Sequence, residues 1–277
     1  MGYKIRRTFT YGEFIEMANS PVDSKLGRMS QLGSEHVTVG TDSYQEAHEL
    51  AEQGWPEGVE KIKVIVERIF ETTRKALEEQ GIRYALDGGA YVDVGRYCSG
   101  EPECFGVFDT VEKIRPIFKL EVCTNMAGNW GEKQIQNRGA AVLGMIDAVE
   151  SVGYSAEVDL IVGSEQRKNT LIYKIRVKNA GEPLDMDRLA FCLMHPAFNR
   201  RISWSAREHE DDATRKAFRY HEGGAYGHPI DLPDEEKSDD ACYVNSMNGY
   251  ERRHFKTEND GAEWVKRQLK EQGLLRG

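Results

Sequence analysis

Four stretches of the chain decide the fold, and they read IFKLEVC at 117–123, QIQNRGAAVLGMIDAVESV at 134–152, SAEVDLIV at 155–162 and TLIYKIRV at 170–177. The second stretch is rich in Ala, Leu, Met and Ile and predicts a helix that ends at Gly153, whereas the other three predict strands. A strand, a helix and a strand in this order favour a crossover connection and an α/β sheet. We therefore predict a central mixed sheet with packed helices.

The segment before this sheet is expected to hold one long helix and a hairpin. Apolar residues recur at intervals of three and four from Val59 to Gln80, and Gly81 ends this helical pattern. The strands of the hairpin are expected at 82–86 and 91–97, with Gly88-Gly89 as the turn. Other elements are expected as an edge strand at 3–9, as helices at 10–19, 43–54, 185–193, 197–208 and 261–272, and as loops at 20–40 and 223–243.

The length of 277 residues suits one large domain or two small ones. We expect a single domain over 1–277, with an α/β core at about 59–209, an N-terminal arm at 1–58 and a C-terminal helical extension at 210–277. The two flanks are not expected to fold separately.

The charge of the chain is acidic overall and unevenly distributed. Lys and Arg number 37 and Asp and Glu number 46, so the net charge of −9 argues against a polycationic binder but not against a local basic groove. Segments 42–60 and 206–240 carry most of the acidic excess. They are interpreted either as solvated acidic faces or as surfaces that repel nucleic acid and leave other faces to bind it.

The sequence predicts a cytoplasmic protein with reduced cysteines. No apolar run approaches the roughly 18–20 residues needed to cross a bilayer, and residues 1–7 lack the apolar region of a secretory signal. The five cysteines are odd in number and widely spaced, which makes a disulfide framework unexpected.

Sequence motifs of catalysis and cofactor binding are absent. The chain has no Gly-x-x-x-x-Gly-Lys-Ser/Thr loop and no Gly-x-Ser-x-Gly turn, and Cys98 and Cys104 lack the spacing and the second pair of a zinc site. We therefore expect no enzymatic activity, catalytic residue, cofactor or metal. The alternative is a nuclease that binds magnesium through scattered carboxylates such as Asp87, Asp93 and Glu121.

Residues 117–162 resemble a von Willebrand factor A-type unit, with a strand, a loop, a helix around RGAAVL at 138–143 and a second strand. In that family the first strand ends in Asp-x-Ser-x-Ser, whose oxygen atoms bind magnesium. The corresponding residues here are CTNMA at 123–127, so the carboxylate and one hydroxyl are missing. The resemblance implies an α/β fold without a metal site, and it leaves a protein-interaction module as an alternative function.

Basic and aromatic residues are interleaved in four clusters, at 6–11, 199–204, 215–221 and 250–256. This mixture suits single-stranded nucleic acid, because cations follow the phosphates and bases stack on exposed rings, at roughly 1–3 kcal/mol per base. The alternative is that the rings anchor the core and the cations form its exposed flank. We expect the clusters to line one groove, with the nucleic-acid-binding residues Arg6, Arg7, Phe9, Tyr11, Arg200, Arg201, Trp204, Lys216, Arg219, Tyr220, Arg252, Arg253, Phe255 and Lys256.

Several short stretches are similar to a family of tailed-phage proteins. They are GWPEG at 54–58, VGRY at 94–97, SGEPE at 99–103 and HPAFNRR at 195–201. The resemblance extends to the single-stranded-DNA-binding cofactors of phage RNA polymerases. It implies a non-enzymatic protein of the host cytoplasm that holds melted promoter DNA and recruits a phage RNA polymerase. The acidic segments and the C-terminal helix are candidate surfaces for that partner.

Overall fold

The computed structural model describes residues 2–19, 29–32, 39–78, 83–85, 91–92, 94–107, 116–220, 228–247 and 254–274. Its centre is a mixed sheet with the strand order β1-β7-β6-β5-β9, in which β8 also pairs with β6. The pairs β1/β7, β5/β6 and β5/β9 are parallel, and β6 runs antiparallel to β7 and β8. The strands are β1 (Lys4–Thr10), β5 (Ile117–Cys123), β6 (Ser155–Gln166), β7 (Asn169–Lys178), β8 (His228–Pro229) and β9 (Ala241–Val244).

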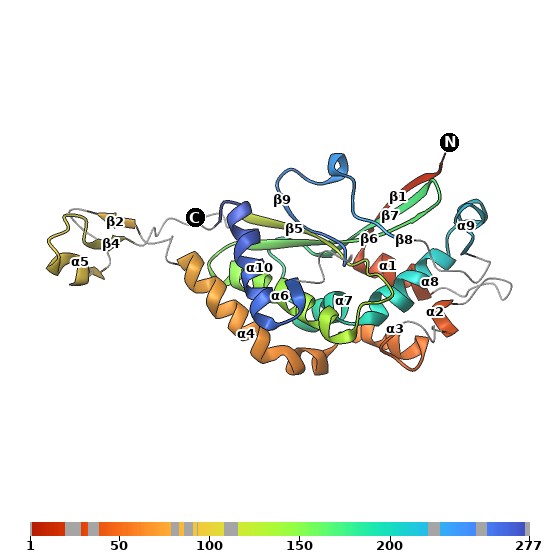
Figure 1. Ribbon diagram of the computed structural model, residues 1–277, viewed down its shortest axis with the longest axis horizontal. Coiled ribbons are helices and arrows are strands. Elements are labelled where there is room, and N and C mark those ends of the chain that lie inside the picture. The colour runs from red at the N-terminus through yellow and green to blue at the C-terminus, as the bar shows by residue number, and fades with distance from the viewer. Residues whose placement is uncertain are drawn as a thin grey trace.

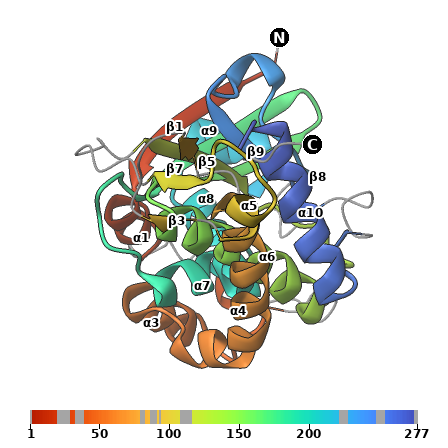
Figure 2. The same cartoon turned by 90° about the vertical axis from the view of Figure 1, so that its left-hand side faces the viewer.

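Helices cover one face of this sheet, as Figures 1 and 2 show from two directions. They bury the main apolar core between themselves and the strands. The predicted α/β class, a central mixed sheet with packed helices, is confirmed. The helices are α1 (Tyr11–Asn19), α2 (Met29–Leu32), α3 (Tyr44–Gln53), α4 (Pro56–Glu78), α6 (Glu132–Ser151), α7 (Met186–Met194), α8 (Ser203–Glu208), α9 (Asp212–Phe218) and α10 (Glu258–Glu271).

Alternation along the strands gives the sheet two different faces. In β5, Phe118, Leu120 and Val122 are buried with the helices, and Lys119 and Glu121 point to the other face because successive side chains of a strand alternate. That second face is crossed by the 228–247 segment, which adds a small apolar cluster of its own. The charged residues of the strands therefore lie between the sheet and this segment.

Local signals located most of the long helices correctly. The helix expected at 134–152 is α6, and those expected at 10–19, 43–54, 185–193 and 261–272 are α1, α3, α7 and α10. Ser43 accepts a hydrogen bond from the backbone of Glu46, and Gly54, at φ +84°, ends α3 in a conformation that favours glycine.

The predicted hairpin at 82–97 is wrong in two respects, and its Gly88-Gly89 turn lies outside the described residues. The strands β2 (Arg83–Ala85) and β3 (Tyr91–Val92) both pair with β4 (Phe105–Val107) and not with each other. Residues Val94–Cys98 form the short helix α5. Arg96 forms an ion pair with Glu101 and donates a hydrogen bond to the backbone oxygen of Glu103, and these interactions stabilise the segment after α5. Figure 1 shows this small sheet at one end of the molecule, beyond α4.

Two further elements were not predicted from local patterns. The acid-rich loop expected at 223–243 contains β9, whose four residues are held by pairing with β5. The helix expected at 197–208 begins as a turn of π-helix at Phe198–Ile202 before α8. No helix in the described ranges is both long enough and apolar enough to cross a bilayer.

Candidate nucleic-acid interface

The first predicted cluster lies on the edge strand β1, where both of its arginines are in ion pairs. Arg6 donates from Nε and Nη2 to the two carboxylate oxygens of Glu236, at 2.5 and 2.7 Å. Arg7 binds Glu210 in the same bidentate manner, at 2.7 and 2.5 Å. The hydrogen bonds from Arg6 lower the pKa of Glu236, which keeps the carboxylate ionised. A phosphate would have to displace these carboxylates.

The second cluster is inside the protein, and this corrects the prediction for Arg200 and Arg201. Both residues are 2% exposed. Arg200 donates to the backbone oxygen of Ala127 at 3.0 Å, and burial lowers its pKa to about 10. Arg201 donates to the backbone oxygens of Ser30, Gln31 and Thr41 at 2.9–3.0 Å. Both guanidinium groups hold the chain together where a nucleic acid cannot reach them.

The aromatic rings of the clusters belong to the core rather than to an exposed stacking surface. Tyr220 and Phe255 are buried, so their predicted role in stacking is wrong. Tyr220 stacks on Phe218 at 5.4 Å, and Phe255 packs edge-on against Trp264 at 5.3 Å. The other rings, Phe9, Tyr11 and Trp204, are half-buried and pack against the main core.

The exposed cations of the clusters do not gather on one surface. Lys216 and Arg219 are exposed at the end of α9, next to β1 at one end of the molecule. Lys256 is exposed at the start of α10, on the side of α4 and α6. Arg252 and Arg253 lie outside the described residues. The prediction of a single continuous groove is therefore not met by the described members of the clusters.

Lys256 instead belongs to a basic pocket of about 220 Å³ that is built from three helical elements. Arg68 comes from α4, Lys133 from the first turn of α6, and Lys256 from the residue before the N-cap of α10. Asn137 of α6 donates to the backbone oxygens of Phe255 and Lys256, at 3.1 and 3.4 Å. This buried amide fixes Lys256 beside α6.

The helix ends around this basic pocket favour an anion. The N-termini of α6 and α10 both reach it, and unpaired backbone N–H groups make the first turn of a helix electropositive. Thr257 and Asp260 form a capping box at α10, so the carboxylate of Asp260 is already hydrogen-bonded to Thr257. The pocket therefore brings three basic side chains and two helix N-termini together.

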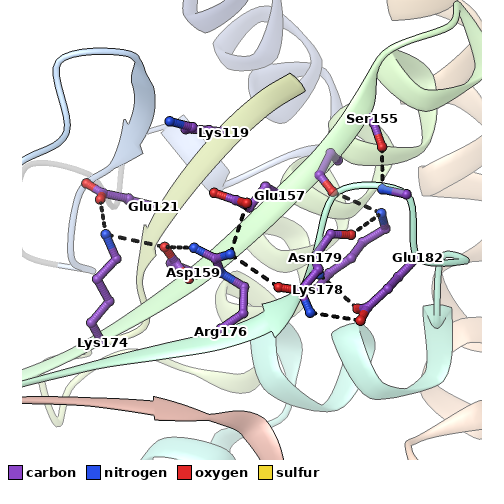
Figure 3. A network of polar contacts seen from close by, with 12 residues as sticks. Lys119, Glu121, Ser155, Glu157, Asp159, Lys174, Arg176, Lys178, Asn179 and Glu182 are labelled. Carbon is purple, nitrogen blue, oxygen red and sulfur yellow. Dashed lines mark hydrogen bonds and ion pairs between the residues drawn. The ribbon is translucent and has the colours of Figure 1, made fainter. Parts of the chain in front are cut away.

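A second polar site lies on the opposite face of the sheet, in a hollow of about 180 Å³ (Figure 3). Lys174 of β7 contacts Glu121 at 2.6 Å and Asp159 at 3.3 Å. Arg176 pairs with Asp159 and Glu157. Each of these charges has an opposite charge within ion-pair distance, so the hollow is neutralised by its own residues. We interpret it as a structural network.

This network also holds the 228–247 segment on the sheet. Ser238 donates from Oγ to Glu121 at 2.6 Å, and Asp240 pairs with Lys119 at 2.6 Å. Burial lowers the pKa of Lys174, but the carboxylates of Glu121 and Asp159 together outweigh burial and raise the pKa. The ammonium group therefore stays charged between them.

Replacing Glu121 by glutamine should lower the free energy of unfolding by about 2 kcal/mol, because it removes a buried charge from Lys174. Glu157→Gln is the matched control, since Glu157 is more exposed and, among the residues that the structure describes, pairs with Arg176 alone; it should cost at most about 1 kcal/mol. Urea denaturation measures both values. Equal losses would contradict the structural role given to Glu121.

The loop after β5, which corresponds to the metal-binding loop of the von Willebrand family, is held in place by Asn125. Asn125 donates to the backbone oxygen of Ile230 at 2.7 Å and accepts from the backbone of Gly163 at 2.9 Å, so its amide braces the loop. Within the described parts of the chain, no group of three or more His, Cys, Asp or Glu residues is placed to hold a metal. Asp87 and Asp93 of the nuclease alternative lie outside those parts. All five cysteines are free thiols.

Arg68, Lys133, Asn137 and Asn259 line the basic pocket but were not predicted as site residues. Arg68, Lys133 and Asn259 are exposed polar residues of helices, which is the usual solvent-facing pattern, whereas Asn137 is buried in α6. Phe70 follows Arg68 by two residues and Trp130 precedes Lys133 by three, but neither cation stands next to a second cation as in the four predicted clusters. Only helix packing brings these residues together with Lys256.

These features define an α/β protein whose mixed sheet is covered by helices on one face and braced by a charged network on the other. The chain belongs to the family of a domain of unknown function, DUF7192, which matches residues 10–276. No curated protein and no solved structure matches the chain.

Proposed function

We propose that the protein binds single-stranded DNA through the basic pocket at the starts of α6 and α10, and acts as a transcription cofactor that recruits a phage RNA polymerase to melted promoters. The observation that carries the DNA-binding part is the convergence of Arg68, Lys133 and Lys256 from three separate elements on one pocket. Cations that neutralise phosphates supply most of the affinity of nonspecific nucleic-acid binding.

The charges elsewhere on the surface favour DNA binding at the basic pocket alone, and not over a wide basic surface. Arg6 and Arg7 are neutralised by Glu236 and Glu210, and the segment 42–60 is acidic. An acidic exterior repels a phosphate backbone except where cations gather. The polymerase part of the proposal rests on the resemblance to tailed-phage proteins, with the acidic segments and α10 as candidate docking surfaces.

The double variant Lys133→Ala/Lys256→Ala should bind a labelled single-stranded oligonucleotide about tenfold more weakly than the native chain, because two phosphate contacts are lost. The slope of log affinity against log salt should fall in magnitude by about 1.4. Fluorescence anisotropy at several salt concentrations measures both quantities. Lys266→Ala is the control, since this partly exposed lysine of α10 pairs with Glu263 and does not line the pocket.

Three results would contradict the proposal: no binding by the native chain, binding that does not respond to salt, or equal affinities for the native chain and the double variant. A duplex of equal length is expected to bind more weakly than the single strand. Tighter binding of the duplex would show that double-stranded DNA, and not single-stranded DNA, is the ligand.

A protein-interaction module on a degenerate von Willebrand factor A-like core is the second candidate. It is supported by α5, which exposes Val94 and Tyr97 at 68% and 65%. Exposed apolar side chains on one short element suit a protein partner. Under this candidate, a pull-down of the phage polymerase after nuclease treatment should succeed with the native chain and fail with Tyr97→Ser. The basic-pocket double variant should then leave the pull-down unchanged.

A further inference from the structure

The strand β1 lies at an edge of the sheet, and no described strand pairs with its outer side (Figure 2). It runs parallel to β7 in continuous register, and Thr170 of β7 donates to the backbone oxygen of Tyr3. In a parallel pair the N–H and C=O of one residue point to the same neighbour, and successive residues alternate. The odd-numbered residues of β1 therefore face β7, and Lys4, Arg6 and Thr8 direct their backbone groups away from the sheet.

This outer edge of β1 is open to a further strand. No hydrogen bond joins the outward backbone groups of Lys4, Arg6 and Thr8 to the described part of the chain, and all three residues are exposed. Proteins commonly protect an edge strand with a proline, a bulge or a covering element. The strand β1 has no proline and no register shift, and it packs mainly against β7 and α1.

The side chains in the middle of β1 do not oppose a neighbouring strand. Ile5 and Phe9 are half-buried against the main core, so apolar side chains of an added strand would cover the rest of their surface. Arg6 is neutralised by Glu236 on the other face, and Arg7 is neutralised by Glu210. The centre of the strand therefore carries little net charge.

The N-terminal end of β1 is basic, which determines the kind of partner that fits. Asn169 accepts from the backbone of Tyr3 at 2.9 Å and donates to the backbone oxygen of Ala217 at 2.7 Å, so it joins β1, the β6–β7 turn and α9. The exposed cations of this corner, none of which forms an ion pair with a described residue, are Lys4, Arg167, Lys168 and Lys216. The carboxylate nearest to the turn in sequence is that of Glu165. Acidic side chains at one end of an added strand would complement these cations.

We propose that β1 binds an extended acidic segment of a partner protein, which joins the sheet as a further strand and places its carboxylates beside Lys4 and Lys168. Backbone hydrogen bonds supply the affinity, and the basic corner supplies the preference for acidic side chains. A second copy of β1 is a poorer match, because this strand has three basic residues and no acidic one. The proposal does not depend on DNA binding.

Fluorescence anisotropy of the full chain with the dye-labelled peptide Glu-Val-Glu-Val-Thr-Val-Thr, and with Thr-Val-Thr-Val-Glu-Val-Glu, tests this proposal. The first peptide places its carboxylates at the basic corner in parallel addition and the second does so in antiparallel addition, so the tighter ligand identifies the direction of the added strand. At least one of them should bind. Replacing both glutamates of that peptide by lysine should weaken binding about tenfold or more.

Thr8→Pro blocks the edge and leaves the β1/β7 pairing intact, because the N–H that proline lacks points outward at this position. It should weaken binding of the acidic peptide about tenfold. Thr8→Val is the matched control, since valine keeps the N–H, and it should bind like the native chain. Lys4→Glu/Lys168→Glu should also weaken binding about tenfold, whereas Lys63→Glu, at an exposed position of α4, should not. Thermal unfolding verifies that the variants are folded.

Amide exchange distinguishes strand addition from simple attraction between charges. The acidic peptide should slow exchange at the outward amides of Arg6 and Thr8 and leave Arg7 and Phe9, which face β7, nearly unchanged. The proposal is overturned if neither acidic peptide binds, if Thr8→Pro binds like the native chain, or if binding leaves exchange at Arg6 and Thr8 unchanged. A dimer of the native chain that Thr8→Pro abolishes would also overturn it, by showing that a second copy occupies the edge. Thr8→Pro should keep native oligonucleotide affinity, so failure here is distinguishable from failure of the proposed DNA-binding function.

Discussion

Replacing Gly139 by alanine should lower the free energy of unfolding by about 3 kcal/mol, the upper part of the range for overpacking a core. Gly139 lies in α6 where α7 passes over it. A β-carbon at this position would overlap the side chain of Met194 and stand 2.6 Å from the backbone oxygen of Leu193. Because one of these obstacles is main chain, the two helices would have to separate.

Gly12→Ala in α1 is the matched control for this substitution. A β-carbon at Gly12 meets nothing within 4 Å, so alanine should be neutral or should stabilise the helix by up to about 1 kcal/mol. Thermal or urea denaturation of both variants measures the difference. A cost below about 1 kcal/mol for Gly139→Ala would show that the contact between α6 and α7 is looser than described.

Replacing Arg201 by methionine should also lower the free energy of unfolding by about 3 kcal/mol, because three backbone oxygens would lose their donor inside the protein. These oxygens belong to Ser30, Gln31 and Thr41, so amide exchange should quicken most in α2 and around Thr41. The oligonucleotide affinity of the folded variant should stay native.

Lys216→Met separates this structural effect from a simple loss of charge. Lys216 belongs to another of the predicted basic clusters but is exposed at the end of α9. Its replacement should change the free energy of unfolding by less than about 0.5 kcal/mol. If Arg201→Met were as stable as Lys216→Met and bound DNA more weakly, Arg201 would be a binding residue and the structural assignment would be wrong.

The fold could largely be predicted because its main signals are local. The strands at 117–123, 155–162 and 170–177 and the helix at 134–152 carry apolar patterns that depend only on neighbouring residues. The β9 strand and the pairing of β2 and β3 with β4 could not be predicted. Short strands are defined by their partners across the sheet, and a single sequence does not record those pairings.

The binding residues were harder to predict because composition does not report burial. Arg200 and Arg201 stand beside Trp204 in the sequence, as phosphate-binding residues often stand beside rings, yet both guanidinium groups bind backbone oxygens in the interior. Lys256 was predicted, whereas Arg68 and Lys133 became visible only when α4, α6 and α10 were assembled.

The sequence by itself determined the α/β class, the long helices and the central strands, since hydrophobic periodicity and helix caps act within a few residues of the chain. Only the tertiary structure decided which cations are buried or paired and which lie close together. Solvation, ion pairing and access depend on residues that are distant in sequence: Glu236 and Glu210 neutralise the arginines of β1, and helix packing places Arg68 beside Lys133 and Lys256.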